Sequence, residues 1–107
     1  MKLLFSRLLL LFSRIIGVYR VDGHSMYPTL KDGDFVFTTS LLPLRVGSLV
    51  VVKHARFDVI VKRVREINAD GITVIGDAPA STSSEAMGVI RRDEVLGRVI
   101  YRVTAGD

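Results

Sequence analysis

Residues 58–66 read Asp-Val-Ile-Val-Lys-Arg-Val-Arg-Glu, and this stretch decides the fold. It is rich in β-branched residues, and a period of two places Ile60, Lys62 and Val64 on one face, which predicts a β-strand. Five further runs of this kind are bounded by Gly, Pro, Asn and Asp, at residues 18–21, 34–38, 48–53, 72–75 and 95–103. No segment after residue 20 has a helical period. The sequence therefore predicts a mainly β domain over residues 21–107, closed into a barrel or strongly coiled because open sheet edges invite aggregation.

A different pattern precedes this domain. Residues 3–16 repeat one heptad, Leu-Leu-Phe-Ser-Arg-Leu-Leu followed by Leu-Leu-Phe-Ser-Arg-Ile-Ile. On a helix the cations and serines would share a polar arc of roughly 140°, and the rest of the surface would be apolar. Two heptads are too few for a coiled coil, and no small-residue cleavage site of a signal peptide is visible. We therefore expect residues 1–20 to form an amphipathic membrane-anchor helix.

The anchor helix could span the bilayer or lie on its surface. A span needs about 20 mostly apolar residues, and Arg7 and Arg14 interrupt this one. Burial of one apolar face combined with attraction to anionic lipid fits the pattern with less strain. A helix on the membrane surface is favoured, and a short or assisted span is the alternative.

The distribution of charge excludes nucleic acid as the expected partner. The net charge is +4, and residues 1–20 carry Lys2, Arg7, Arg14 and Arg20 with no acidic side chain. Residues 21–107 hold 11 basic and 11 acidic side chains and are neutral. The chain has no Cys, which excludes disulfides, a Cys nucleophile and a thiolate zinc site. No phosphate-binding Gly-rich loop or metal-ligand cluster is present, and we expect no metal and no cofactor.

Ser25 is a candidate nucleophile in a turn between the first two predicted strands. Gly23 lets the backbone approach a ligand, and Pro28 stiffens the turn beyond the serine. A serine hydroxyl needs a base to become nucleophilic. His24 is poorly placed, because adjacent residues of an extended chain point to opposite faces, and His54 falls in a predicted surface turn. A Ser-His-Asp triad is therefore not expected.

Lys62 is the more suitable base. Of the four lysines it alone lies between two β-branched residues on an apolar strand face, where desolvation would favour the neutral amine. The alternative is a lysine with a buried stem whose amine reaches solvent. Residues 76–84 are rich in small hydroxyl residues. They form either a flexible linker or a loop that donates a hydroxyl to orient the Lys62 amine.

Several short motifs, in this order along the chain, resemble the conserved boxes of type I signal peptidases between about residues 21 and 102. They are Ser-Met-x-Pro-Thr-Leu at 25–30, Gly-Asp at 33–34, Val-Lys-Arg-Val at 61–64 and Gly-Asp with a Ser-rich tail from 76. In that family a Ser-Lys dyad hydrolyses peptide bonds on the outer side of a membrane, in a coiled β fold shared with LexA-like repressors. The resemblance implies that Ser25 is the nucleophile and backbone oxyanion donor, Lys62 the general base and Ser81 the hydroxyl that orients Lys62.

The same resemblance implies substrate contacts at Gly23, Met26 and Pro28. It implies a membrane-associated endopeptidase that removes a signal or leader peptide from a precursor protein. The short length of the chain is similar to that of the branch of the family that matures nickel superoxide dismutase. The domain would lie on the extracytoplasmic side, or on the cytoplasmic face if the anchor only lies on the surface.

Two departures from the family pattern motivate an alternative. Many members have a serine where this chain has Gly23, and residues 83–85 read Ser-Ser-Glu where the family has Asp-Ser-Arg. A side-chain oxyanion donor can be worth about 10²–10³ in rate. The alternative is a catalytically weakened, membrane-tethered module that binds extended peptides.

Overall fold

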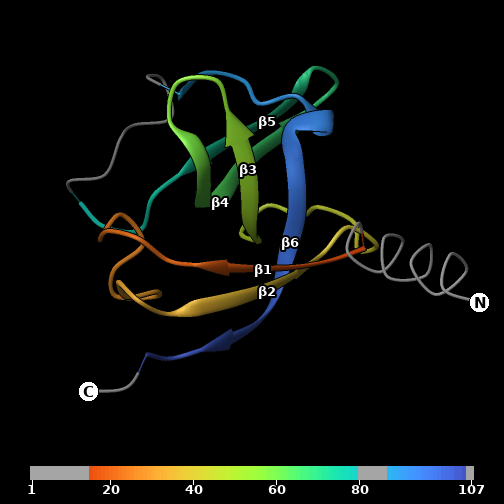
Figure 1. The fold of residues 1–107 in the computed structure, drawn as a ribbon. Coiled ribbons are helices and arrows are strands. Elements are labelled where there is room, and N and C mark those ends of the chain that lie inside the picture. The colour runs from red at the N-terminus through yellow and green to blue at the C-terminus, as the bar shows by residue number, and fades with distance from the viewer. Residues whose placement is uncertain (1–14, 80–86, 106–107) are drawn as a thin grey trace, which may run out of the picture.

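The computed structural model describes residues 15–79 and 87–105 as one six-stranded antiparallel sheet (Figure 1). The strands follow one another across the sheet in the order β1-β2-β6-β3-β4-β5. A 3₁₀ turn, η1, precedes the last strand. The elements are β1 (Ile16–Arg20), β2 (Phe35–Thr39), β3 (Leu49–His54), β4 (Asp58–Asn68), β5 (Gly71–Ile75), η1 (Arg92–Glu94) and β6 (Val95–Val103).

The mainly β prediction is confirmed, and the last strand has the predicted bounds. The other strands depart from their predicted bounds by at most two residues at either end. The expected helix over residues 1–20 is wrong for residues 16–20, which pair with β2 along their whole length as β1. Residues 1–14, which carry most of the predicted anchor, lie outside the described residues. Within the described ranges, no helix is long and apolar enough to cross a membrane.

The sheet is strongly coiled around β6. The first half of β6 pairs with β3, and its second half pairs with β2. Register shifts at Phe37/Thr38 and Val51/Val52 interrupt both ladders, and such bulges increase the local twist. As a result β1 and β2 run across the direction of β3 (Figure 1). The pairings among the described residues begin at β1 and end at β5, so they form a coiled sheet and do not close a barrel.

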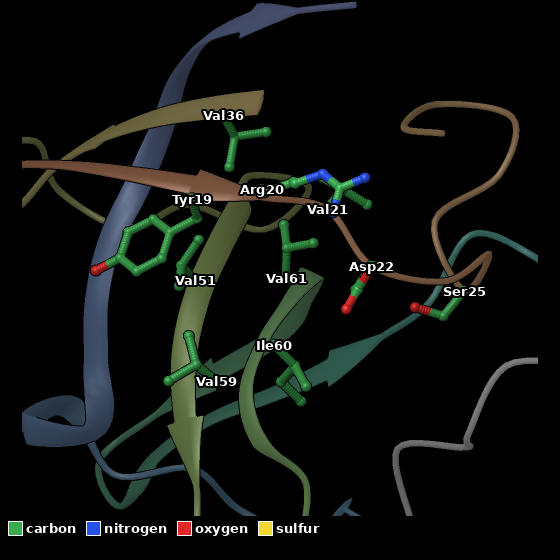
Figure 2. A pocket seen from close by; sticks show the side chains of 10 residues that line it. All are labelled: Tyr19, Arg20, Val21, Asp22, Ser25, Val36, Val51, Val59, Ile60 and Val61. Carbon is green, nitrogen blue, oxygen red and sulfur yellow. The ribbon is translucent and has the colours of Figure 1, made fainter. Parts of the chain in front are cut away.

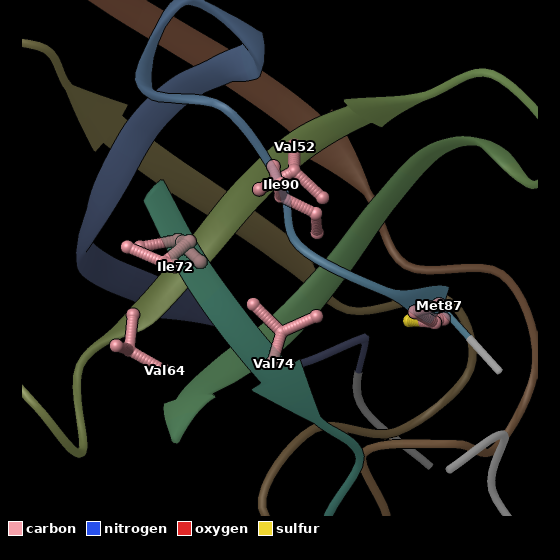
Figure 3. Close-up of a cluster of buried hydrophobic side chains, with 7 residues drawn as sticks. Val52, Val64, Ile72, Val74, Met87 and Ile90 are labelled. Atoms are coloured by element: carbon pink, nitrogen blue, oxygen red, sulfur yellow. The ribbon is translucent and has the colours of Figure 1, made fainter. Parts of the chain in front are cut away.

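The coiling produces two hydrophobic clusters, one on each side of β3. Alternate residues of a strand point to opposite faces, so Val50 and Val52 enter the first cluster and Val51 enters the second. The first cluster (Figure 3) contains Val50, Val52, Val64, Ile72, Val74, Met87 and Ile90. The second contains Val21, Met26, Leu30, Val36 and Val51. The second cluster anchors the turn that carries Ser25.

Residues 87–90 are fastened to β5 and to the end of β3. Ile72 and Ile90 exchange backbone hydrogen bonds of 2.8 and 2.7 Å. Gly71 has a φ of 146°, and a Cβ there would lie 2.1 Å from the Ile90 carbonyl oxygen, so only glycine permits this approach. His54 was expected at the surface but is half-buried. Its Nδ1 accepts the backbone N–H groups of the following turn, so Nε2 carries the proton and donates to the Met87 carbonyl over 2.9 Å.

Candidate active site

The turn at residues 25–29 presents Ser25 above the second cluster. The N–H of Tyr27 donates to the His24 carbonyl over 3.1 Å, and the N–H of Leu30 donates to the Met26 carbonyl over 2.9 Å. The side chains of Met26 and Leu30 are each 1% exposed and hold the turn against the sheet. The side chain of Met26 is therefore a core residue beneath the turn, which corrects the expectation that it contacts substrate. Ser25 itself is partly exposed.

Gly23 and Pro28 flank this turn at the surface. Gly23 has a φ of +91°, the left-handed region that favours glycine, and nothing lies within 4 Å of a Cβ placed there. Its N–H donates to Asp32 Oδ1 over 2.8 Å and is therefore not available to an oxyanion. Pro28 follows a cis peptide bond and is exposed. Neither residue lines the pocket beside Ser25, and their contacts with substrate stay predictions.

Beside Ser25 is a pocket of about 320 Å³ (Figure 2). It lies between the end of β1 and residues 59–61 of β4, and Figure 2 shows Asp22 between Ser25 and Ile60. Its wall is of mixed character, because Arg20, Asp22 and Ser25 lie beside valine and isoleucine side chains. The lining residues are Tyr19, Arg20, Val21, Asp22, Ser25, Val36, Val51, Val59, Ile60 and Val61. The sequence did not predict this pocket, because its wall combines side chains from four strands.

Lys62 is buried in β4. It is 3% exposed and pairs across the ladder with Val50, which belongs to the first cluster. On the same face Val64 is buried and Ile60 is half-buried, so the predicted alternation is confirmed. Desolvation by this burial lowers the pKa of the Lys62 ammonium below its usual value of 10.5. At 3% exposure the amine does not extend into solvent, and this excludes the alternative of a surface-reaching lysine.

The Ser25 turn and β4 border one pocket, but Lys62 itself is not among the residues that line it. Ser25 lines the same pocket as Ile60 and Val61, the two residues before Lys62. The Ser25 carbonyl also accepts the N–H of Ala78 over 2.9 Å, and Ala78 follows β5, the neighbour of β4. Ser81, the predicted orienting hydroxyl, lies outside the described residues. Its role stays a prediction.

Asp77 fastens the Ser25 turn to the residue next to Lys62. It accepts the hydroxyl of Thr29 over 2.5 Å and receives two guanidinium hydrogen bonds from Arg63, of 2.9 and 2.7 Å. The hydrogen bonds from Arg63 are the largest cause that lowers the pKa of the Asp77 carboxyl. Arg63 also donates to the Gly47 carbonyl over 2.7 Å. These contacts tie together the elements that carry the candidate nucleophile and the candidate base.

No role was expected for Asp77 or Arg63 from the sequence. The available signal was their place in the motifs. Arg63 directly follows Lys62, and Asp77 lies two positions after Ile75, the last residue of the adjacent strand β5. The Arg63–Asp77 pair is partly buried, with side-chain exposures of 33% and 15%. A bidentate pair of this kind fixes geometry as well as contributing energy.

Asp34 holds the other end of the turn. Its carboxylate is 1% exposed and accepts the N–H of Lys31 over 2.9 Å and the N–H of Ala105 over 3.0 Å. These backbone donors, that of Lys31 first, lower the pKa of Asp34 below 3.8. Arg102 of β6 donates to the Thr29 carbonyl. The turn that carries Ser25 is thus bound to the sheet at both ends.

A family model described as Peptidase S24-like matches residues 8–100. The chain belongs to the Peptidase S24-like family. It is also similar to signal peptidase I of Streptococcus pneumoniae, serotype 4 strain TIGR4 and strain R6, with 36% identity over 76 residues in each case. That similarity covers 69% of this chain and 32% of the relatives, so the matched part spans about a third of their length.

These comparisons identify the sheet as an S24/signal peptidase-like serine peptidase domain. The resemblance to signal peptidases inferred from the motifs is thereby supported at the level of distant similarity. No cluster of three His, Asp or Glu side chains able to hold a metal ion occurs within residues 15–79 and 87–105 of this S24-like domain. The groups that the site does present are a hydroxyl, a buried amine and a carboxylate–guanidinium pair.

Proposed function

We propose that this S24-like peptidase is a membrane-associated serine endopeptidase that removes an N-terminal signal or leader peptide from a precursor protein. Ser25 is its nucleophile and Lys62 its general base. The observation that carries the proposal is the burial of Lys62, 3% exposed, in the strand segment that forms the wall of the Ser25 pocket. A lysine can serve as a base near neutral pH only when its surroundings favour the neutral amine, and burial has that effect.

The proposed reaction begins with neutral Lys62. Its amine takes the proton of Ser25 Oγ as that oxygen attacks the scissile carbonyl carbon, and the backbone N–H of Ser25 stabilises the oxyanion. The carbon–nitrogen bond then breaks, and the leaving amine receives the proton from Lys62. Water, deprotonated by the same amine, attacks the Ser25 ester, and collapse of this second intermediate releases the acid and regenerates both side chains.

The shape of the pocket supports a peptide substrate. Six of its ten lining residues are valine or isoleucine, which suits an apolar side chain close to the cleaved bond, and Arg20 and Asp22 add polar groups that can contact the peptide backbone. An extended substrate would gain affinity from main-chain hydrogen bonds to a strand edge. The short-branch resemblance makes a nickel superoxide dismutase precursor one candidate substrate. The orienting hydroxyl of Ser81, membrane attachment through residues 1–20 and an extracytoplasmic domain are further parts of the proposal.

The direct test is cleavage of a candidate precursor by the full chain, with the new N-terminus mapped by mass spectrometry. Ser25→Ala and Lys62→Ala should each abolish cleavage. Lys53→Ala is the matched control, because Lys53 is an exposed lysine at the end of the neighbouring strand. Cleavage that persists in Ser25→Ala would refute the assignment of the nucleophile.

A second candidate is a domain that binds extended peptides without turnover. It is favoured by one observation, the engagement of the Gly23 N–H by Asp32, since many signal peptidases have a second oxyanion donor at this position. This candidate predicts that the full chain binds a leader peptide with unchanged affinity in Lys62→Ala and releases no product at any enzyme concentration. Product that accumulates with repeated turnover excludes it.

A further inference from the structure

The connection between β2 and β3 exposes an unusual amount of apolar surface. Leu41 is 71% exposed, Leu42 45% and Val46 65%. These three large aliphatic side chains fall within six residues, 41–46. Single exposed apolar residues are ordinary, whereas several in one short loop indicate a surface that is covered when the protein works.

This loop lies where the chain enters the domain from the predicted anchor. β2 ends at Thr39, opposite Ile16, the first residue of β1. The N–H of Ser40 then donates to the carbonyl of Ile15 over 3.0 Å. Figure 1 shows the start of β1 and the β2–β3 connection on the same side of the molecule. In the sequence, residues 1–14, which precede Ile15, are apolar and basic, the same combination of side chains as in the loop.

Three arginines, Arg45, Arg92 and Arg98, lie in or beside the loop, and the acidic Asp93 and Glu94 follow Arg92 on η1. Arg45 is exposed within the loop. Below it, Arg92 and Arg98 line a pocket of about 130 Å³ together with Leu42 and Leu44, and no carboxylate is among the described residues that line it. Arg98 also donates to the Pro43 carbonyl over 3.1 Å, which holds the loop against β6. Aliphatic side chains flanked by guanidinium groups are the combination that binds an anionic bilayer surface.

We propose that residues 41–46 are a membrane-contacting loop that docks the domain on a bilayer containing anionic lipid. Leu41, Leu42 and Val46 enter the boundary between headgroups and acyl chains, and Arg45 and Arg92 face lipid phosphates. This contact is separate from the anchor and from the peptidase chemistry. The Ser25 turn lies at the other end of β1, roughly 17 Å along this five-residue strand at about 3.3 Å per residue.

The absence of tryptophan from the chain allows a clean fluorescence test. Leu41→Trp in the full chain places one reporter in the loop, and Val89→Trp, at a residue 51% exposed on a different segment, is the control. With vesicles of phosphatidylcholine and phosphatidylglycerol, we expect the emission of Leu41→Trp to shift to the blue and that of Val89→Trp to stay unchanged. Vesicles of phosphatidylcholine alone should give a weaker shift. An unchanged emission of Leu41→Trp in the presence of anionic vesicles overturns the proposal.

Cosedimentation with the same vesicles gives the second measurement. The double substitution Leu41→Ser and Leu42→Ser should lower lipid partitioning about tenfold, since each removes an apolar side chain from the contact. Val89→Ser should leave it unchanged. Ser25→Ala should bind as the parent does, which separates this proposal from the peptidase assignment. Unaltered lipid partitioning of the double variant overturns the proposal. Emission of Leu41→Trp that is already blue-shifted before lipid is added also overturns it, because it would indicate a second copy of the chain on the loop.

Discussion

Replacing Lys62 with methionine separates its proposed catalytic role from its effect on stability. Methionine is similar in length and apolar, so it can occupy the site without the buried amine. The side chain is 3% exposed and faces the first hydrophobic cluster through its pairing with Val50. We therefore predict that Lys62→Met lowers peptidase activity by orders of magnitude while stabilising the fold at neutral pH.

The magnitudes follow from burial. An amine transferred from water into this environment costs about 1–3 kcal/mol on mutational scales, so Lys62→Met should raise the free energy of unfolding by about that amount. Lys62→Ala also removes the amine but loses three buried methylenes at about 0.8 kcal/mol each, and should be less stable than Lys62→Met by about 2 kcal/mol. Loss of the general base should lower kcat/KM by about 10²–10⁴-fold in both variants.

The pH dependence provides a further check. Because folding lowers the pKa of Lys62 below 10.5, the unfolded chain binds more protons than the folded one between the lowered pKa and 10.5. The free energy of unfolding of the parent therefore rises with pH across that interval. The difference in stability between Lys62→Met and the parent should shrink accordingly. Below the lowered pKa the difference should be constant.

The assays are hydrolysis of a leader-bearing peptide and chemical unfolding of the full chain across pH. Lys53→Met is the control, because Lys53 is exposed and its replacement should change neither activity nor stability appreciably. Appreciable activity in Lys62→Met would refute the role of the base. A fold that is destabilised by methionine at neutral pH would refute the reasoning from burial.

Three further predictions concern the frame around the site. Asp77→Asn weakens the bidentate pair with Arg63 and should lower kcat/KM about tenfold or more, with a smaller loss for the exposed control Asp70→Asn. Since the carboxyls of Asp34 and Asp77 have pKa values below 3.8, each stabilises the fold fully above that pH, and this contribution is lost as the pH falls through the lowered value. Acid unfolding monitored by circular dichroism should therefore be less steep in Asp34→Asn, and an identical profile would contradict this. Gly71→Ala should cost about 3 kcal/mol or more, because its Cβ meets the Ile90 carbonyl, whereas Gly23→Ala in open space should cost only about 1–2 kcal/mol of backbone strain.

The strands and the burial of Lys62 could be predicted because both depend on a local period of two. The period of two predicted one face with Ile60, Lys62 and Val64, and in β4 burial alternates over residues 61–64, where Lys62 and Val64 are buried. The start of β1 could not be found in this way. A heptad pattern extends to residue 16, and the pairing of Ile16 with Thr39 on a distant strand overrides it.

The pocket and the Asp77 contacts depend on the way the sheet coils. The pocket wall combines Tyr19, Val36, Val51 and Val61, which lie on four different strands. No local pattern brings these residues together. Met26 is a second case in which the local sequence did not reveal the three-dimensional environment. The motif suggested a substrate contact, but the side chain of Met26 is directed into the second cluster.

The measurement that tests the dyad most directly is covalent labelling by a serine-acylating reagent, read by intact and peptide mass spectrometry. We expect one adduct, located on Ser25, that forms faster as the pH rises through the lowered pKa of Lys62 and is nearly absent in Lys62→Met. An adduct at another serine, or labelling of Ser25 at an equal rate in Lys62→Met, would contradict this expectation.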